Sequence, residues 1–447
     1  MARYLVAATP IPGHVAPMTA IAADLRRRGH QVRMLTGAAF SGAVASGVSF
    51  AGLPEDAEVM RTRVGHGRMP GLLRRWRAGR AELDANFLAP IAGQYRALTA
   101  ELDRRDYDAV LVDVMFTGAI PLLLAAGPRP PVIVCGVVPL MLSSADAAPF
   151  GVGWRPEAGR DYTLMNRFVQ RVLFGGDQSR LDAILREWDL GPAPMFLLDW
   201  PVLAEAMVQF TVAEFEYPRR DLPATVVFAG PIVAPAPRQA VLPDWWGALD
   251  RAKTVVHVTQ GTWDNSDLDQ LIRPTLDALG DRADVVVVAC TGGARPPSGP
   301  IPANAYVAEF LSYQRLLPHV DVMITNGGYG GVQQALSHGV PLIVAGDTAD
   351  KPETAARVAH FGAGIDLGTA RPRPAAIAEA VDRVLTSPRM RESSGRLARA
   401  IAHSAPLDTL AAVLAETADV RCLFDGTTKV PTGDKFPISA TGPADRE

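Results

Sequence analysis

Cysteine is scarce in this chain. Its 447 residues include three cysteines, Cys135, Cys290 and Cys422, which lie far apart. Such wide spacing excludes a disulfide framework and a thiolate metal site. Cys135 and Cys290 stand within apolar runs, so we expect both to be buried hydrophobic residues.

Long hydrophobic runs are also missing. No stretch reaches the roughly 18 apolar residues that a membrane-spanning helix requires, so no span is expected. The apolar stretch near the start, residues 4–8, is too short and too soon interrupted for a signal peptide. We therefore expect a cytoplasmic protein.

The chain has no excess of basic charge. Its 44 Lys and Arg stand against 47 Asp and Glu, for a formal net charge of −3. Without a basic surface to displace counterions from phosphates, nucleic acid is not expected as a partner. Arginine supplies nearly all the positive charge, and the lysines are Lys253, Lys351, Lys429 and Lys435.

Apolar residues are plentiful and arranged in a repeating order. They make up 48% of the chain, and a chain of 447 residues predicts two to three domains. Short β-type runs alternate with amphipathic helical stretches such as 19–28 and 268–279. Apolar strands separated by helices predict an α/β fold, with parallel sheets covered by helices on both faces. The predicted strands are 4–9, 31–35, 109–113, 131–137, 226–229, 254–259, 284–289, 306–310, 322–325, 341–345 and 364–367.

One seam divides the chain. Residues 230–237 are rich in proline and have no periodicity, which is typical of a linker. We therefore predict an N-terminal domain over 1–230, a linker over 231–244 and a C-terminal domain over 245–400. An apolar helical stretch, 401–420, follows. Residues 421–447 show no regular pattern, so we expect a flexible tail.

The first candidate site follows the first predicted strand. That strand ends in Thr9-Pro-Ile-Pro-Gly-His14, and a helix follows. Parallel sheets bind ligands at the carboxyl ends of their strands, which places His14 at the edge of a cleft. The turn lacks the G-x-G-x-x-G fingerprint, which disfavours a dinucleotide-dependent oxidoreductase. His14 also has a purely structural interpretation.

Asp113 ends another apolar strand, 109–113. A carboxylate in such a place needs a partner or water. A pair with His14 would fix the imidazole tautomer and raise its basicity. The alternative is a helix N-cap, because residues 116–120 begin the next element.

A glycine-rich turn marks the second candidate site. Residues 325–336, Thr-Asn-Gly-Gly-Tyr-Gly-Gly-Val-Gln-Gln-Ala-Leu, predict a strand, a turn and a helix in succession. Bare amides at a helix N-terminus bind anions such as phosphate. Gly261 and Thr262 end another strand of the same domain, and 346–352 follows a third. These segments together predict a phosphate-binding cleft.

With these motifs in place, the chain resembles the inverting UDP-sugar glycosyltransferases of the GT-B fold, in particular bacterial enzymes that glycosylate natural products. The resemblance runs from Tyr4 to about Val420. The motifs that carry it are Pro12-Gly13-His14 with Pro17, residues 28–32, Phe228–Pro231, Leu316-Leu317-Pro318, the glycine-rich turn, Gly339-Val340-Pro341, Asp350-Lys351-Pro352 and Ala356-Arg357-Val358. It implies two Rossmann-like domains facing across a cleft, and a C-terminal helix that crosses back to the N-terminal domain.

The resemblance also implies roles for single residues. His14 falls on the general base and Asp113 on the acid that pairs with it. The implied donor site comprises Gly261, Thr262 at the phosphates, Phe310 stacking on the base, the Leu311 backbone beside it, Asn326, the amides of Gly328, Gly330, Gly331 and Val332, Gln334 at the ribose, and Asp350 and Lys351 at the sugar hydroxyls.

Several positions depart from the family's usual residues. Asn326 stands at the usual pyrophosphate-binding His, and Gly331-Val332 stand where hydroxyl residues are frequent. Ser312-Tyr313 replaces a frequent Pro-Gln. Lys351 replaces a Gln, and this cation could contact an anionic group of the donor or pair with Asp350 or Asp347 and only shape the pocket.

The acceptor pocket is expected in the N-terminal domain between residues 65 and 154. Apolar lining there would suit a hydrophobic aglycone, although core packing explains each residue equally well. The candidates are Phe87, Met115, Phe116, Met141, Phe150 and Trp154.

No cofactor or metal is expected. The acid pairs Asp106/Asp108 and Asp267/Asp269 lie at element ends, where solvated acids are common. The sequence thus predicts a hexosyltransferase that uses a UDP- or TDP-sugar and a small aglycone, as a monomer or homodimer. An epimerase on the same fold and a non-catalytic sugar-nucleotide-binding protein remain the alternatives.

Overall fold

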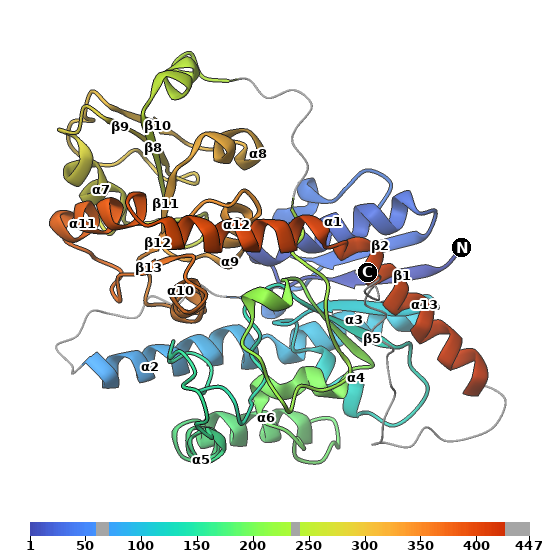
Figure 1. The fold of residues 1–447 in the computed structure, drawn as a ribbon. Coiled ribbons are helices and arrows are strands. Elements are labelled where there is room, and N and C mark those ends of the chain that lie inside the picture. Colours follow the sequence, from blue (N-terminus) through green and yellow to red (C-terminus); the bar gives the residue numbers. More distant parts are fainter. Residues whose placement is uncertain (60–70, 234–241, 425–447) are drawn as a thin grey trace, which may run out of the picture.

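The computed structural model describes residues 1–59, 71–233 and 242–424, which form two α/β domains (Figure 1). The predicted linker (231–244) and tail (421–447) include residues 234–241 and 425–447, which lie outside this description. Parallel sheets flanked by helices confirm the predicted α/β class.

The N-terminal domain holds a seven-stranded parallel sheet of order β3-β2-β1-β4-β5-β6-β7. Its strands are β1 (Arg3–Ala7), β2 (Gln31–Thr36), β3 (Ser49–Gly52), β4 (Ala109–Asp113), β5 (Val132–Gly136), β6 (Ala206–Gln209) and β7 (Val226–Phe228). Its helices are α1 (Pro12–Arg27), α2 (Gly71–Leu83), α3 (Ile91–Arg104), α4 (Ala119–Leu124), α5 (Thr163–Phe168) and α6 (Gly175–Arg186).

The C-terminal domain holds a six-stranded parallel sheet of order β10-β9-β8-β11-β12-β13. Its strands are β8 (Thr254–Thr259), β9 (Val285–Cys290), β10 (Ala305–Ala308), β11 (Val322–Thr325), β12 (Leu342–Val344) and β13 (Gly364–Asp366). Its helices are α7 (Ile272–Leu279), α8 (Tyr313–Leu316), α9 (Tyr329–Ser337), α10 (Lys351–His360), α11 (Pro374–Leu385) and α12 (Pro388–His403), with α13 (Pro406–Phe424) following. Both strand orders reverse beside a central strand, as in a doubly wound sheet.

Short helical turns complete the two domains. The 3₁₀ turns are η1 (Ala38–Ala43), η2 (Glu55–Ala57), η5 (Leu197–Leu203), η6 (Ala213–Phe215), η7 (Trp246–Arg251) and η8 (Leu317–His319), and the π-helical turns are η3 (Asp84–Leu88) and η4 (Val169–Leu173).

Both faces of each sheet are buried because neighbouring residues of a strand point to opposite sides. Along β1, Leu5 packs into a core with residues of α3 and α6, whereas Val6 packs into a core with residues of α1 and α13. Along β12, Leu342 faces α9, α10 and α12, and Ile343 faces α7 and α11. Continuous apolar runs, rather than alternating ones, follow from this double burial.

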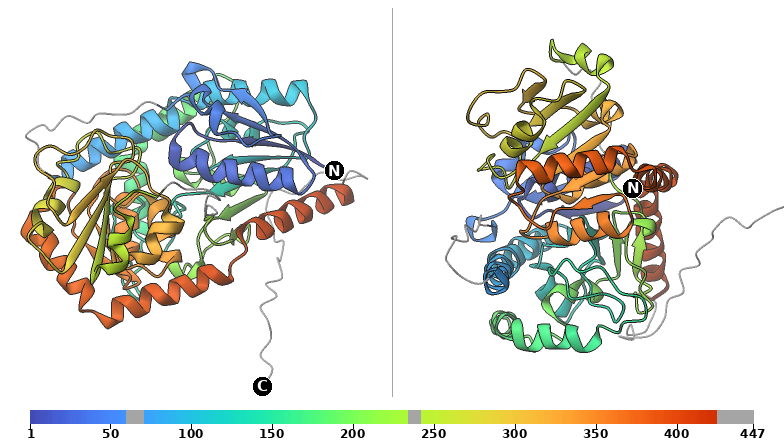
Figure 2. Two further views of the ribbon diagram at one scale, coloured as in Figure 1. Left: turned by 90° about the horizontal axis from the view of Figure 1, so that it is seen from above. Right: turned by 60° about the vertical axis from the view of Figure 1, so that its left-hand side comes forward.

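Helix α13 lies alongside the N-terminal domain, although it follows the C-terminal domain in sequence (Figures 1 and 2). Leu410 and Leu414 share a buried core with β1 and α1, and Asp408 pairs with Arg28 at the end of α1. The helix continues to Phe424, beyond the expected end at residue 420.

The sequence missed two strands and misplaced one helix start. β3 is a short edge strand with Ser and Gly at its ends, and β6 has only four residues. Such short segments carry little periodicity. The helix expected over 268–279 begins at Ile272.

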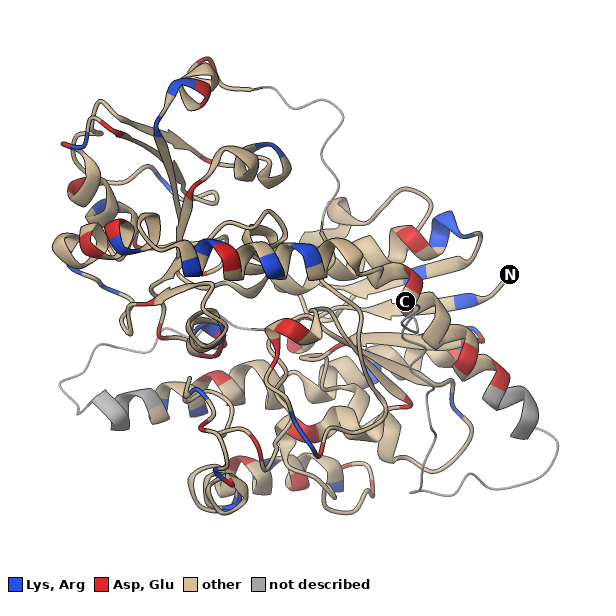
Figure 3. Cartoon of the chain, viewed as in Figure 1, with Lys and Arg blue, Asp and Glu red and all other residues tan. Residues whose placement is uncertain are grey.

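The surface carries charges of both signs over both domains, and α12 shows them close together (Figure 3). One pair on this helix is Arg396 with Glu392, at 3.4 Å between Nη1 and Oε1. No helix of the described residues is long and apolar enough to cross a membrane.

His257 predicts a measurable pH dependence of stability. It is fully buried in β8, with Nδ1 2.9 Å from the Val288 carbonyl oxygen, and burial lowers its pKa to about 4. In the unfolded chain the pKa of histidine is about 6.5, so the unfolded state binds more protons between these values. The free energy of unfolding should therefore decrease as pH falls from about 6.5 toward 4, by at most about 1.4 kcal/mol per pH unit from this residue.

The His257→Asn variant should show a shallower decrease in urea denaturation between pH 7.5 and pH 4.5, because Asn does not titrate there. His403→Asn changes an exposed histidine and should keep the wild-type slope. Equal slopes for wild type and His257→Asn would contradict the assignment.

Candidate active site

The candidate site is a cleft of about 1030 Å³ between the two domains. It is lined from the N-terminal domain by residues after β1, β4 and β5, and from the C-terminal domain by residues after β8, β10, β11 and β12. The switch points of both sheets, between β1 and β4 and between β8 and β11, therefore contribute to one cleft. Ligands of doubly wound sheets bind at these points.

His14 and Asp113 form a pair at the N-terminal side. His14 lies in the first turn of α1, and its Nδ1 is 2.7 Å from Oδ1 of Asp113 at the end of β4. His14 is 6% exposed and lines the cleft, whereas Asp113 is fully buried. This contact orients the ring so that Nε2 is left for other partners.

Backbone amides hold the Asp113 carboxylate in place. The amide of Thr9 donates to Oδ2, and the amide of Met115 donates to Oδ1 at 2.9 Å. Such hydrogen bonds satisfy a buried carboxylate and restrict its rotation. Asp113 therefore holds His14 from a fixed position rather than capping the following helix.

The glycine-rich turn provides an anion-binding N-terminus. Gly328 is the N-cap of α9, so the amides of Tyr329, Gly330 and Gly331 have no acceptor within the helix. Gly328, Gly330 and Gly331 line the cleft opposite the His14 side, together with Gly261 and the exposed Thr262. Bare amides with the helix dipole behind them suit a phosphate group.

The amides of Val332 and Gly328 were both expected to bind phosphate, and both have partners within the protein. Val332 is fully buried, and its amide donates to the Gly328 carbonyl oxygen at 3.1 Å, so it is not free for a phosphate. The amide of Gly328 faces Oδ1 of Asn326 at 3.4 Å. The side chain of Asn326 donates through Nδ2 to the Gln260 carbonyl oxygen at 2.6 Å, which ties the turn after β11 to the turn after β8.

Three further donor-site candidates lie after β10 and on α9. Phe310 lines the cleft with 61% of its surface exposed, so its ring is available for stacking. Leu311 lines the cleft next to it, and its backbone hydrogen bonds to the thiol of Cys290. Gln334 does not line the cleft, and its Oε1 accepts a hydrogen bond from Gln314 at 3.2 Å.

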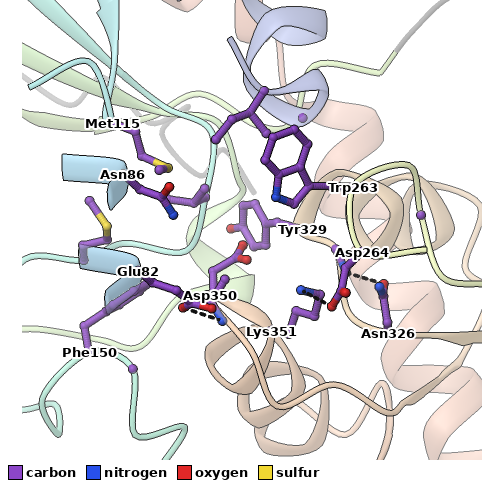
Figure 4. Close-up of a pocket in the computed structure, with 18 of the residues that line it drawn as sticks. Glu82, Asn86, Met115, Phe150, Trp263, Asp264, Asn326, Tyr329, Asp350 and Lys351 are labelled. Carbon is purple, nitrogen blue, oxygen red and sulfur yellow. Dashed lines mark hydrogen bonds and ion pairs between the residues drawn. The ribbon is translucent and has the colours of Figure 1, made fainter. Parts of the chain in front are cut away.

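The end of the cleft nearest α10 is acidic. Glu82, Asp264 and Asp350 line it with Lys351 (Figure 4). Burial raises the pKa of Asp350, against the opposing charges of Lys351 and His14. Burial likewise raises the pKa of Glu82, whose Oε2 accepts a hydrogen bond from the Ala349 amide at 3.1 Å.

Lys351 pairs with neither of the partners expected from the sequence. Its Nζ lies 3.2 Å from Oδ2 of Asp264 and 2.8 Å from Oγ1 of Thr348, which in turn donates to Asp264 at 3.1 Å. Figure 4 shows the lysine directed toward Asp264. The contact links the loops after β8 and β12.

This geometry predicts that Lys351→Gln has a small effect on the KM of a nucleotide-sugar donor in the site that the resemblance implies. Because Asp264 and Thr348 already engage the ammonium group, the donor KM should stay within roughly threefold of wild type, less than the tenfold that about 1.4 kcal/mol represents. Steady-state kinetics with UDP-glucose would measure it. Asp350→Asn, which changes the neighbouring carboxylate, should raise the donor KM more. A tenfold rise for Lys351→Gln would show direct contact with the donor.

The other half of the cleft is mostly apolar. Five of the expected acceptor residues line it, namely Phe87, Met115, Met141, Phe150 and Trp154. Phe116 does not, because it is fully buried in the core of the N-terminal domain. Met115 lies in the turn that follows β4 and lines the cleft, whereas the next residue, Phe116, does not.

Sequence reasoning missed several lining residues. Glu82, Asn86 and Trp76 come from α2 and η3, and Leu173 comes from η4. Both π-helical turns of the described chain line this half, and π-helical turns are frequent at functional sites. No motif or periodicity of the sequence marked Glu82 or Trp76 as lining residues.

The described residues contain no group of three or more His, Cys, Asp or Glu side chains placed to hold a metal. The acid pairs noted in the sequence have other partners. Asp108 accepts a hydrogen bond from the Arg3 amide at 2.7 Å, and Asp267 pairs with Arg371 at 2.5 Å.

Solved structures share this architecture. The glycotransferase of kitacinnamycin matches with a TM-score of 0.71 and 21% identity, covering 93% of this chain and 99% of that one. The calicheamicin glycosyltransferase CalG4 matches with a TM-score of 0.66 and 21% identity, covering 94% and 99%. Two Rossmann-like domains around a shared cleft therefore define the GT-B fold of glycosyltransferases, as predicted.

Sequence relatives define the family. The chain is 38% identical over 411 residues to 4'-demethylrebeccamycin synthase of Lentzea aerocolonigenes, covering 89% of this chain and 94% of the relative. It is 33% identical over 408 residues to UDP-glucosyltransferase A1 of Starmerella bombicola, covering 88% and 87%. Residues 273–415 match the C-terminal domain of erythromycin biosynthesis protein CIII-like proteins. The chain belongs to the UDP-glycosyltransferase family and is a hexosyltransferase of natural-product type, which confirms the resemblance and the predicted enzyme class.

Proposed function

We propose that this enzyme transfers a hexose from a UDP- or TDP-sugar to a hydroxyl group of a small apolar aglycone, with inversion, and that His14 is the general base. The observation that carries the proposal is the His14–Asp113 pair: His14 lines one side of the cleft with Asp113 buried behind it, and the free amides of α9 lie on the other side. The UDP-glucosyltransferase among the relatives supports a UDP-sugar as the donor.

The chemistry follows from these groups. Nε2 of His14 accepts the proton of the acceptor hydroxyl as that oxygen forms a bond to the anomeric carbon. Asp113 stabilises the resulting imidazolium. The bond from the anomeric carbon to the diphosphate breaks, and the amides of Tyr329, Gly330 and Gly331 stabilise the charge that develops on the leaving group. Attack from the face opposite the diphosphate inverts the anomeric centre.

The apolar half of the cleft supports the aglycone assignment. Phe87, Met115, Met141 and Phe150 would bury a hydrophobic ring system beside His14, and Asn86 offers a polar group among them. At the opposite end, Asp350 would bind sugar hydroxyls. Phe310 would stack on the nucleotide base.

The epimerase alternative requires further carboxylates in the cleft, and Glu82 and Asp264 are present. Both are already engaged, by the Ala349 amide and by Lys351. Because these two carboxylates already have partners, we favour sugar transfer over epimerisation.

A screen by mass spectrometry would test the proposal. UDP- and TDP-hexoses would be combined with a panel of apolar phenols and alcohols, and nucleotide release would be measured with and without acceptor. Glycosylated acceptor and acceptor-dependent release are expected. Release or sugar interconversion without any acceptor would support the epimerase, and donor binding without turnover would support the non-catalytic alternative.

Transfer should be independent of divalent metals, because backbone amides take the place that a metal would have at the diphosphate. Activity should remain within about twofold in excess EDTA, since no metal-bound charge is lost. The same assay with added manganese is the control. Complete loss in EDTA that manganese or magnesium restores would contradict this prediction.

A further inference from the structure

A loop of the N-terminal domain is held by a helix of the C-terminal domain. The amides of Gly151 and Gly153 both donate to Oε1 of Glu353 on α10, each at 2.9 Å. Glu353 is 5% exposed, so the accepting carboxylate is largely withdrawn from water, whereas Gly151 on the donor side is exposed. Phe150, Gly151, Val152 and Trp154 of the same loop line the apolar half of the cleft.

The loop is packed closely against α10. Gly153 has a φ of 66°, in the left-handed region that favours glycine. A Cβ atom at this position would lie 2.8 Å from Cβ and 2.9 Å from the carbonyl oxygen of Pro352. Pro352 directly follows Asp350 and Lys351, so the loop rests on the turn that carries the residues of the proposed sugar site.

Glu353 is itself held by a buried ionic cluster. Nη1 of Arg357 lies 3.1 Å from Oε2 of Glu353, and Nη2 of Arg357 lies 2.6 Å from Oε1 of Glu216. Glu216 belongs to the N-terminal domain and accepts a hydrogen bond from the Leu140 amide at 3.2 Å, next to the cleft residue Met141. Since all three charged groups are buried, the position of the Glu353 carboxylate is well determined.

We propose that Glu353 is a positioning residue for the acceptor: it holds loop 149–154 against α10 and so sets the wall of the acceptor half from the helix that bears the donor-sugar residues. That an acceptor occupies this half of the cleft rests on the proposed function, whereas the docking of the loop on α10 does not. Substitution of a residue that merely joined the domains would raise the KM values of the donor and of the acceptor equally. Substitution of a positioning residue raises the KM of the acceptor more.

Three substitutions and a control separate these roles. Glu353→Ala removes the carboxylate oxygen that accepts hydrogen bonds from both loop amides. It leaves Arg357 paired with Glu216, so the fold should persist. Glu353→Gln keeps an Oε1 that can accept from both amides. Gly153→Ala disturbs the same contact from the loop without touching the ionic cluster. Glu157→Ala changes an exposed residue of the same segment and serves as the control.

Hydrogen exchange of the Gly151 and Gly153 amides is the first measurement. Glu353→Ala should speed exchange by about tenfold or more, as expected when hydrogen bonds to a charged group are lost. Glu353→Gln should restore much of the protection, and Glu157→Ala should match wild type. Unchanged exchange in Glu353→Ala would overturn the docking.

Steady-state kinetics with UDP-glucose and 4-methylumbelliferone is the second measurement. Glu353→Ala and Gly153→Ala should each raise the KM for 4-methylumbelliferone by about tenfold while the KM for UDP-glucose stays within about twofold, because the cleft-lining residues of the loop lie in its apolar half. Equal rises in both KM values would overturn the positioning role. Exchange is measured without substrate, so failure of the proposed transfer reaction would leave the first result intact.

Discussion

His14→Ala is expected to lower the rate of transfer by about 10²–10⁴-fold, the range that a positioned general base contributes. His14 lines the cleft with Nδ1 on Asp113, so the substitution removes the only imidazole of the described residues that lines this cleft. Donor affinity should stay within a few-fold, since the phosphate-binding amides of α9 are untouched. Single-turnover kinetics and equilibrium binding of UDP would measure the two quantities.

Asp113→Asn should lose less activity than His14→Ala, because Asp113 orients and stabilises the imidazole without taking the proton itself. His403→Ala removes an exposed histidine at the end of α12 and is the matched control. Transfer at the wild-type rate in His14→Ala would remove His14 as the base.

Arg357→Met is expected to lower the free energy of unfolding by about 3–5 kcal/mol, because it removes the ion pair of the buried Glu353 and leaves Glu216 only the more distant Arg219, at 3.6 Å. Glu216 and Glu353 are 2% and 5% exposed, and both contact this guanidinium. Burial raises the pKa of the Glu216 carboxyl, but the charges of Arg357 and Arg219 and the hydrogen bonds that Glu216 accepts together outweigh it and keep that pKa below its usual range. Equilibrium denaturation in urea at neutral pH would measure the loss.

The control is Arg396→Met, which breaks an exposed pair with Glu392 on α12 (Figure 3). Exposed pairs contribute about 0–1 kcal/mol, so this variant should remain close to wild type. A loss below about 1 kcal/mol for Arg357→Met would contradict this prediction and mean that the buried cluster contributes little to folding.

Much of the fold follows from local patterns. Every strand expected in the C-terminal half is present, because strands buried on both faces are continuous apolar runs bounded by glycine and proline. β3 and β6 were missed because short strands have no such run. Helix α13 was expected from its apolar composition, and its packing against α1 became apparent only from the tertiary contacts.

For the candidate site, too, some residues could be predicted from local sequence and others could not. His14 and the glycine-rich turn were found because each directly follows a strand, where the topology of a parallel sheet places ligands. Phe116 was wrongly assigned to the pocket because an apolar residue next to a cleft and one directed into the core look alike in sequence. For Lys351 the sequence left a donor contact or a pair with Asp350 or Asp347 open, and it missed Asp264 because that residue lies on a different loop, 87 positions earlier in the chain.

The sequence by itself determined the two doubly wound domains, the histidine after the first strand and the anion-binding turn, because each depends on residues that are close together in the chain. Only the tertiary structure decided which carboxylates share the acidic end of the cleft and which loop forms a wall of its apolar half. Glu82 meets Ala349 across 267 positions, and Glu353 meets Gly151 across 202. Such contacts depend on how two domains pack, and no local periodicity encodes the direction of a side chain across that interface.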